Sequence, residues 1–297
     1  MQHLEVPSFS THSHFAFVFQ IKTEMNQGKQ YQDYYMIRPG EVARDMYVVF
    51  NDNEGNSCAQ VKFDVPFQLV QQISGKRNVG VACTQFTVPN APRNITVEFD
   101  NNVLYYKEHK IVLRDGYYES LDQIEEEIQL ALASSNSQIG TIFQLDHLGY
   151  VTLTTEAPLY IPIARGRAVI LDALSEKLGF TSPQYEHVTL DGYTCLKINP
   201  GTKANKCGDM FGAVSECLLT CDQCIYTKET HRVLCVFSLA AYPSRSHLHL
   251  LPIAKHRPIH DTPYLHSLCF RLVDRYNRPL SFVSGVPSAT IELQHLI

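Results

Sequence analysis

The pattern of apolar and polar positions predicts short β-strands along most of the chain. Residues Ala59–Val65 alternate between apolar and polar side chains, which is the period of a half-buried strand. Further apolar runs of strand length are Met46–Phe50, Val79–Val88, Ala213–Leu219, Cys224–Tyr226, Val233–Leu239, His247–Ile253, Leu268–Val273 and Ala289–Leu296. Turn-forming residues separate these runs and no repeat period is visible, so a β-sandwich or jelly roll is favoured over a solenoid or propeller.

A helical period interrupts the strands in the middle of the chain. From Leu121 to Leu132 apolar residues recur every three or four positions and form one stripe. Ser120 precedes this stripe and Gln123 follows three residues later, which is the spacing of a capping box at a helix N-terminus. Gly116 predicts a turn just before the helix.

Two more local patterns surround this helix. Ile95–Phe99 and Val103–Tyr106 flank a turn-prone stretch and predict a hairpin. Ala168–Leu178 predicts a second helix, and Gly179 stands where a left-handed C-terminal cap is expected. The order of elements from Ile111 to Phe180 is then β-α-β-β-β-α, a small α+β module between stretches of strands.

These patterns predict a mainly β protein, a sandwich or jelly roll with an inserted small α+β module. We expect residues 1–45 to form an N-terminal arm with a strand or two, because this part is polar and rich in histidine and glutamine. The predicted sandwich comprises residues 46–108 and 183–297, and the predicted module comprises residues 109–182.

Composition narrows the functional classes. The 297 residues carry a formal net charge of -5, and no dense cluster of Lys and Arg is visible, which argues against direct nucleic-acid binding. No apolar run approaches the ~18 residues of a membrane-spanning helix. The residues after Met1 lack the features of a secretory signal, so we expect the nine cysteines to be free thiols in an intracellular product.

Cysteine spacing gives the best candidate for a metal site. Cys217, Cys221 and Cys224 lie close together in sequence, with His231 nearby. Structural zinc usually requires four Cys or His ligands in paired knuckles, and here the second pair is missing. Because the surrounding residues are strand-like, ligands three apart would point to opposite faces. We therefore expect free, partly buried thiols, no bound metal and no cofactor.

A second interpretation invokes the histidines. His247 and His249 form a His-x-His pair of the kind that metal-dependent jelly-roll enzymes use, but no acidic ligand follows within a few residues. The chain also has no glycine-rich phosphate loop and no Gly-x-Ser-x-Gly elbow. We therefore expect a protein without catalytic activity, with a His-rich metal-dependent enzyme as the less favoured alternative.

The order of several short motifs resembles that of the penton-like minor capsid proteins of Polinton/Maverick elements and of the adintovirus and adomavirus groups. The resemblance covers residues 46–297. The motifs that carry it are Phe63–Pro66, Gly116–Ser120, Leu178–Phe180 and Asp274–Pro279, followed by the last strand at Ala289–Leu296.

This resemblance implies a virion protein, assembled into capsids inside the host cell. It implies a single jelly-roll sandwich with an inserted small α+β module, standing at the icosahedral vertex. The protein would form a homo-oligomeric ring, expected to be a pentamer, and contact the major capsid protein, with a fibre or cement protein as a further partner. Candidate interface residues are Tyr117, Tyr118, Arg278 and Pro279. Two alternatives stay open. For the tyrosines, the alternative is that they only cover the helix N-terminus and form no interface. For the function, the alternative is a cellular jelly-roll binding module.

Overall fold

The computed structural model describes residues 35–36, 42–50, 58–68, 79–133, 140–181, 183–225, 232–260 and 264–296. The chain divides into Met1–Asp33 and Tyr34–Ile297. Most of the predicted arm, residues 1–45, lies outside the described residues.

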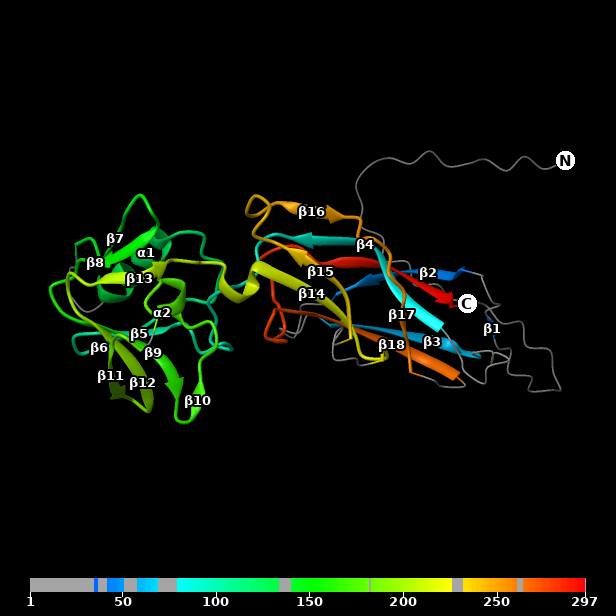
Figure 1. Ribbon diagram of the computed structural model, residues 1–297, viewed down its shortest axis with the longest axis horizontal. Coiled ribbons are helices and arrows are strands. Elements are labelled where there is room, and N and C mark those ends of the chain that lie inside the picture. The colour runs from blue at the N-terminus through cyan, green and yellow to red at the C-terminus, as the bar shows by residue number, and fades with distance from the viewer. Residues whose placement is uncertain are drawn as a thin grey trace. The chain divides into compact units, whose positions relative to one another are not determined.

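Eight main strands and two short ones form two sheets, antiparallel except where β1 pairs with β3 (Figure 1). One sheet has the order β16-β4-β19-β2 and the other β3-β18-β14-β15, with the short strands β17 beside β4 and β1 beside β3. The strands are β1 (Tyr35–Met36), β2 (Val42–Val49), β3 (Cys58–Gln68), β4 (Val79–Pro89), β14 (Glu216–Cys221), β15 (Val233–Ser238), β16 (His247–Leu250), β17 (Arg257–Pro258), β18 (Tyr264–Val273) and β19 (Ser288–His295).

The pairing of these strands identifies the fold. Counting the eight main strands along the chain, the first pairs with the eighth, the second with the seventh, the third with the sixth and the fourth with the fifth. All four pairings are antiparallel, as in a long hairpin that is rolled into two facing sheets. This is the winding of a jelly roll, and it confirms the predicted fold class.

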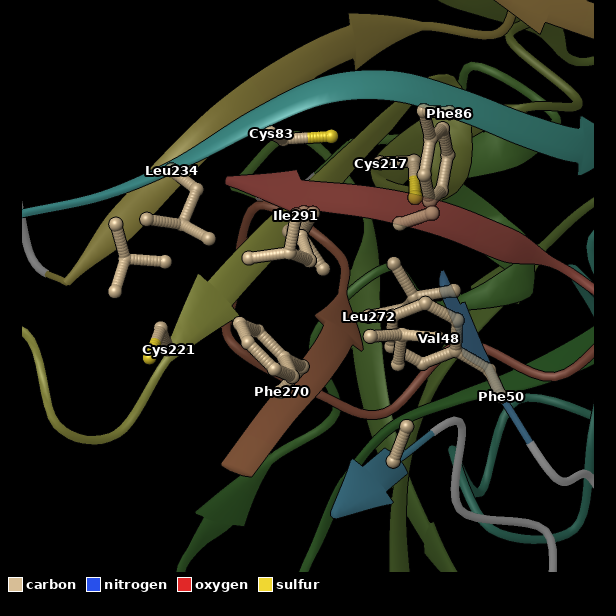
Figure 2. Close-up of a cluster of buried hydrophobic side chains, with 14 of the residues drawn as sticks. Val48, Phe50, Cys83, Phe86, Cys217, Cys221, Leu234, Phe270, Leu272 and Ile291 are labelled. Atoms are coloured by element: carbon tan, nitrogen blue, oxygen red, sulfur yellow. The ribbon is translucent and has the colours of Figure 1, made fainter. Parts of the chain in front are cut away.

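Apolar side chains fill the space between the two sheets (Figure 2). On β2 and just after it, Met46, Val48 and Phe50 are buried while Tyr47 and Val49 are exposed, which is the alternation expected of a strand with one face on the core. Stacked rings of Phe86 and Phe237, with centroids 4.3 Å apart, join β4 of one sheet to β15 of the other. The interior of the sandwich is thus a packed core.

The inserted module lies between β4 and β14 in sequence. It contains a sheet of order β11-β12-β9-β5-β6 with β10 beside β9, a sheet of order β13-β8-β7, and two helices that share a second core with them. The elements are β5 (Val103–Tyr106), β6 (His109–Val112), α1 (Leu121–Ala133), β7 (Phe143–Leu145), β8 (Tyr150–Leu153), β9 (Leu159–Arg165), β10 (Ala168–Val169), α2 (Leu174–Lys177), β11 (Glu186–Leu190), β12 (Tyr193–Ile198) and β13 (Lys203–Cys207).

The predicted limits of the module, 109–182, are too narrow. Residues 103–106 and 186–207 pair with module strands, so they do not belong to the sandwich segments 46–108 and 183–297. The sequence did not indicate β11 and β13 because both lie at sheet edges and most of their side chains are exposed. Edge strands of this kind lack the apolar alternation that marks a half-buried strand.

The predicted hairpin of Ile95–Phe99 with Val103–Tyr106 is also wrong. Ile95 makes only an isolated bridge, and its partner is Gly116, which we predicted in a turn. Asp100 has a φ of 57°, so the chain turns sharply before β5, which pairs with β6 instead. A bridge to a residue far along the chain cannot be read from local periodicity.

Helix α1 forms where the apolar stripe predicts it, with Ile124, Ile128 and Leu132 buried. The Gln123 side chain accepts a hydrogen bond from the backbone N–H of Glu119 at 2.7 Å, one residue before the predicted cap Ser120. None of the helices in the described part of the chain is long and apolar enough to cross a membrane.

The second predicted helix, Ala168–Leu178, is only half correct. Its first residues form β10, and α2 begins at Leu174. Asp172, with a φ of 60°, takes the left-handed conformation that helices exclude, so the helical pattern cannot extend through it.

Gly179 ends α2 with a φ of +81°. Its N–H donates to Glu176 O at 3.0 Å, and the N–H of Phe180 donates to Ser175 O at 2.8 Å, the two hydrogen bonds of a Schellman motif. A Cβ at this position would lie 2.2 Å from the carbonyl oxygen of Lys206. Both the conformation and the close backbone approach therefore require glycine.

We predict that Gly179→Ala lowers the free energy of unfolding by about 2–4 kcal/mol, because it combines left-handed strain with a backbone clash. Gly166→Ala is the matched control, since Gly166 has a φ of +61° and a methyl group added there would meet nothing within 4 Å. This control should lose only about 1 kcal/mol. Urea denaturation measures the free energy of unfolding of both variants. Equal losses would mean that the close approach of the Lys206 carbonyl oxygen to Gly179 adds nothing to the cost of the substitution.

Candidate functional site

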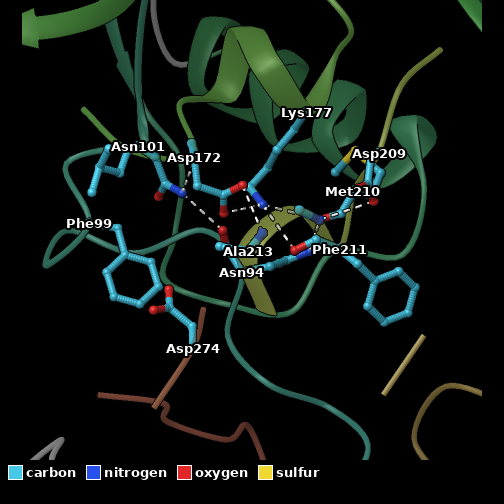
Figure 3. Close-up of polar contacts among 12 residues, drawn as sticks. Asn94, Phe99, Asn101, Asp172, Lys177, Asp209, Met210, Phe211, Ala213 and Asp274 are labelled. Carbon is cyan, nitrogen blue, oxygen red and sulfur yellow. Dashed lines mark hydrogen bonds and ion pairs between the residues drawn. The ribbon is translucent and has the colours of Figure 1, made fainter. Parts of the chain in front are cut away.

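Polar side chains from four segments meet where the module connects to the sandwich (Figure 3). The segments are residues 94–101 after β4, residues 171–177 within the module, residues 209–213 before β14, and residues 274–279 between β18 and β19. We call this group of contacts the junction.

A buried ion pair lies at the centre of the junction. The Lys177 ammonium is 2.7 Å from the Asp172 carboxylate, and their side chains are 0% and 3% exposed. Lys177 Nζ also donates to the carbonyl oxygens of Met210 and Phe211, each at 3.3 Å. Asp172 Oδ1 accepts a hydrogen bond from the backbone N–H of Ala213 at 3.0 Å. The pair thus joins α2 to the segment that returns to the sandwich.

The environment of this pair sets its electrostatics and its packing. Burial lowers the pKa of the Lys177 ammonium, and the Asp172 carboxylate opposes that shift. Gly212 packs directly against the pair with a φ of +54°, and a Cβ there would lie 2.0 Å from Asp172 Oδ1. Only glycine allows the returning segment to come this close.

Arg278 connects the turn after β18 to the module. Its Nε donates to Asp274 Oδ2 at 2.7 Å, and its guanidinium lies over the Phe99 ring, 3.9 Å from the centroid. Nη1 donates to the carbonyl oxygen of Leu171 at 2.9 Å, and Nη2 is 3.8 Å from Asp172 Oδ2. One side chain therefore contacts Asp172 and Asp274 of the junction and an aromatic face.

Two buried asparagines complete the junction. Asn94 Nδ2 donates to the carbonyl oxygens of Tyr118 and Met210, both at 2.8 Å, and its Oδ1 accepts from the N–H of Tyr118 at 2.9 Å. Asn101 Nδ2 donates to the carbonyl oxygens of Asn94 and Asp172 at 3.0 and 3.2 Å. Side chains that bond backbone groups from several segments fix those segments at one mutual geometry.

The sequence interpretation missed Asp172, Lys177 and Gly212. A signal was present, because Lys177 lies on the same helical face as Leu174 and Leu178, where an apolar residue is expected. A lysine on an apolar stripe indicates a buried partner, but the pattern does not say which carboxylate provides it.

The two tyrosines that we predicted as interface residues are buried, at 8% and 7% exposure, so their interpretation as contact surface is wrong. Tyr117 donates its hydroxyl to Ser244 Oγ at 2.9 Å and packs edge-to-face on Phe211. Tyr118 donates its hydroxyl to the carbonyl oxygen of Arg114 at 2.8 Å, and burial raises its pKa to about 12. Both serve the internal packing around the helix N-terminus.

The other predicted interface residues, Arg278 and Pro279, lie at the base of the β18–β19 turn. Arg278 points into the junction, and Pro279 forms an isolated bridge with Val273. The exposed part of this turn is Arg275–Asn277 instead.

A cavity of about 510 Å³ lies beside the junction. Arg114 and Arg245 line it, and each is paired with a glutamate: Arg114 with Glu127, and Arg245 with Glu119 at 2.8 Å. The remaining lining includes Val283 and residues 115–118 before α1. The two arginines that line the cavity are thus already paired with acidic side chains of the same chain.

The candidate metal ligands Cys217, Cys221 and Cys224 are buried. Burial raises the pKa of the Cys217 thiol, and a hydrogen bond with Cys224 raises that of Cys221. His231 lies outside the described residues. Within the described ranges, no group of three or more His, Cys, Asp or Glu side chains is placed to hold a metal ion.

The His-x-His pair faces away from the sandwich interior. His247 and His249 are exposed on β16, while Leu248 between them is buried in the core. His249 Nδ1 lies 3.1 Å from Thr87 Oγ1 on the outer face of the neighbouring strand. A metal held inside the jelly roll would therefore not reach this pair.

No family model and no curated protein matches this chain. Among solved structures, it is similar to the mavirus penton protein, with a TM-score of 0.39, 12% identity, and coverage of 85% of this chain and 99% of that one. It is also similar to a chain of the Sputnik virophage, with a TM-score of 0.33, 10% identity, and coverage of 84% and 98%. Both TM-scores are below 0.5, so the assignment of the fold rests on the strand pairing described above.

We predict that thiol reagents label only Cys58 and Cys207 rapidly in the folded protein, because these two are exposed while the other seven are buried or half-buried. Under denaturant all nine thiols should react, since all nine are free. Rapid labelling of Cys221 or Cys224 without denaturant would contradict their burial.

We predict that Lys177→Met lowers the free energy of unfolding by about 3–5 kcal/mol, because it leaves the Asp172 carboxylate buried without its partner. Adding Asp172→Asn should recover part of the loss, since the uncompensated charge is then removed. Lys197→Met is the control: Lys197 forms a surface pair with Glu186 at 2.8 Å, and its loss should cost less than about 1 kcal/mol. Chemical denaturation measures the free energy of unfolding of the three variants. A loss of stability in Lys177→Met no larger than that of the control would refute the prediction.

Proposed function

We propose that this protein is a virion structural protein that forms a homo-oligomeric ring at capsid vertices and contacts the major capsid protein. The observation that supports this most is the jelly-roll winding around an apolar core, with one folded module inserted between the third and fourth strands. Jelly rolls of this kind recur in viral shells, where they act as building blocks.

The packed interior favours a structural role over an enzymatic one. A jelly-roll enzyme or small-ligand module needs a cavity between its sheets, and here aromatic and aliphatic side chains occupy that space. The function of such a body then depends on its surfaces and loops, where partners make contact. Partners of this class are a neighbouring copy, the major capsid protein, and a fibre or cement protein.

The junction supports the same interpretation. A component of a shell must keep its inserted module in a defined position relative to its sandwich, so that every copy in the particle has the same shape. Buried paired charges and backbone-bonded asparagines fix geometry in this way more than they add stability. The ordered sequence motifs, which resemble those of penton-like proteins, fit this role and a location in virions assembled inside the host cell.

Cryo-electron microscopy of capsids assembled in cells from this chain and a cognate major capsid protein tests the proposal. We expect density for the jelly roll and its module at the five-fold vertices. Capsids made without this chain are the control and should lack that density. Density only inside the shell, or at no symmetry axis, would refute the vertex role. Capsids that contain none of this chain would favour a cellular binding module.

A further inference from the structure

Two apolar patches lie at opposite edges of one sheet of the sandwich. In the order β16-β4-β19-β2, the strand β2 forms one edge and β16 the other. On β2, Tyr47 and Val49 are 68% and 47% exposed, and we call these two residues the β2 patch. Their side chains alternate with buried ones, so they occupy the outer face of the sheet.

The second patch follows β16. Residues Leu251–Ala254 include three apolar side chains and a proline in one run, and Leu251 and Ile253 are 81% and 96% exposed. We call Leu251 and Ile253 the β16 patch. Pairing with β4 resumes only at Arg257, so this segment leaves the sheet and presents its side chains outward.

Such exposure indicates a surface that another molecule covers. Scattered apolar residues are common on protein surfaces, but Leu251, Ile253 and Ala254 are exposed together within four residues, with Pro252 half-buried between them. The four side chains of both patches together expose on the order of 500 Å². A standard interface buries about 1,600 Å² in total and has an apolar centre within a polar rim, so the patches match such a centre in size.

We infer that the β2 patch of one copy packs against the β16 patch of the next copy. This inference rests on the ring-forming role proposed above and adds the surfaces that form the ring. A ring of identical subunits needs two different, mutually complementary surfaces on each subunit, whereas a two-fold dimer needs one surface that contacts itself. Thr87 and Thr290 on the intervening strands separate the two patches, so they are distinct surfaces at opposite edges.

Sedimentation analysis of the full chain tests whether the patches drive assembly. We expect the unmodified protein to form rings at concentrations up to about 1 mM, a range that includes weak capsid contacts. Tyr47→Lys and Ile253→Lys should each abolish rings, because each places a charge in an apolar contact. Leu130→Lys on α1 is the control. Leu130 is an apolar residue outside both patches, 62% exposed and thus comparable with Tyr47, so its substitution should leave the rings intact.

Mixing the two blocked variants tests the pairing of unlike patches. Tyr47→Lys retains its β16 patch and Ile253→Lys retains its β2 patch, so an equimolar mixture should form one-to-one dimers and stop there. The two remaining faces both carry lysine and repel each other. Circular dichroism of each variant verifies that it is folded, and native mass spectrometry of the mixture identifies the dimer.

The outcomes separate this inference from the proposed function. Rings that persist in both single variants, blocked variants that form no mixed dimer, or an unmodified chain that stays monomeric would each overturn the patch pairing. None of these results concerns the vertex position, which the images of assembled capsids decide. Vertex density together with a failed mixing experiment would mean that other surfaces form the ring.

Discussion

The antiparallel winding of the jelly roll determines where every connection of the sandwich lies. Because β4 pairs with both β16 and β19, the end of β4 lies next to the starts of those two strands. The pairing of β14 with β18 places the start of β14 beside the end of β18. The module must therefore leave and return at the end of the sandwich that carries the β18–β19 turn. This constraint explains why Arg278 from that turn reaches Asp172 of the module.

The chemistry of the junction follows from this geometry. Four segments that cross at one end bring many backbone N–H and C=O groups out of water, and each needs a partner. Asparagine and aspartate side chains provide those partners, and Lys177 neutralises the charge that Asp172 introduces. The pair costs desolvation energy, which its mutual attraction and its hydrogen bonds to backbone groups of the returning segment offset.

Local sequence patterns were sufficient for the fold class, because strands with one buried face show a two-residue period and α1 shows a clear apolar stripe. They failed where a contact distant in sequence determines the structure. Ile95 bridges Gly116, and Asp172 adopts a left-handed conformation that the helical pattern around it does not reveal. Edge strands β11 and β13 were missed because exposed edges carry little apolar signal.

The site was less predictable than the fold. The tyrosines before α1 have the composition of an interface, but their rings are buried and their hydroxyls bond within the chain. Whether an aromatic residue covers its own core or meets a partner depends on the neighbouring segments, and sequence spacing does not contain that information. Lys177 interrupts an apolar stripe, which is a signal in the sequence, whereas no sequence pattern marks Gly212.

The position of the module between β4 and β14 also governs how the chain folds. These strands belong to opposite sheets, and the whole module separates them in sequence, so an unfolded insertion would impose a large loop-closure entropy on the sandwich. Module strands pair mostly with near neighbours in sequence, such as β5 with β6 and β11 with β12, and contacts of this kind form fast. In the folded module the two ends are held together at the junction, where Asn94 of the entering segment donates to the carbonyl oxygen of Met210 in the returning segment, so the module connects β4 to β14 as a short connection would.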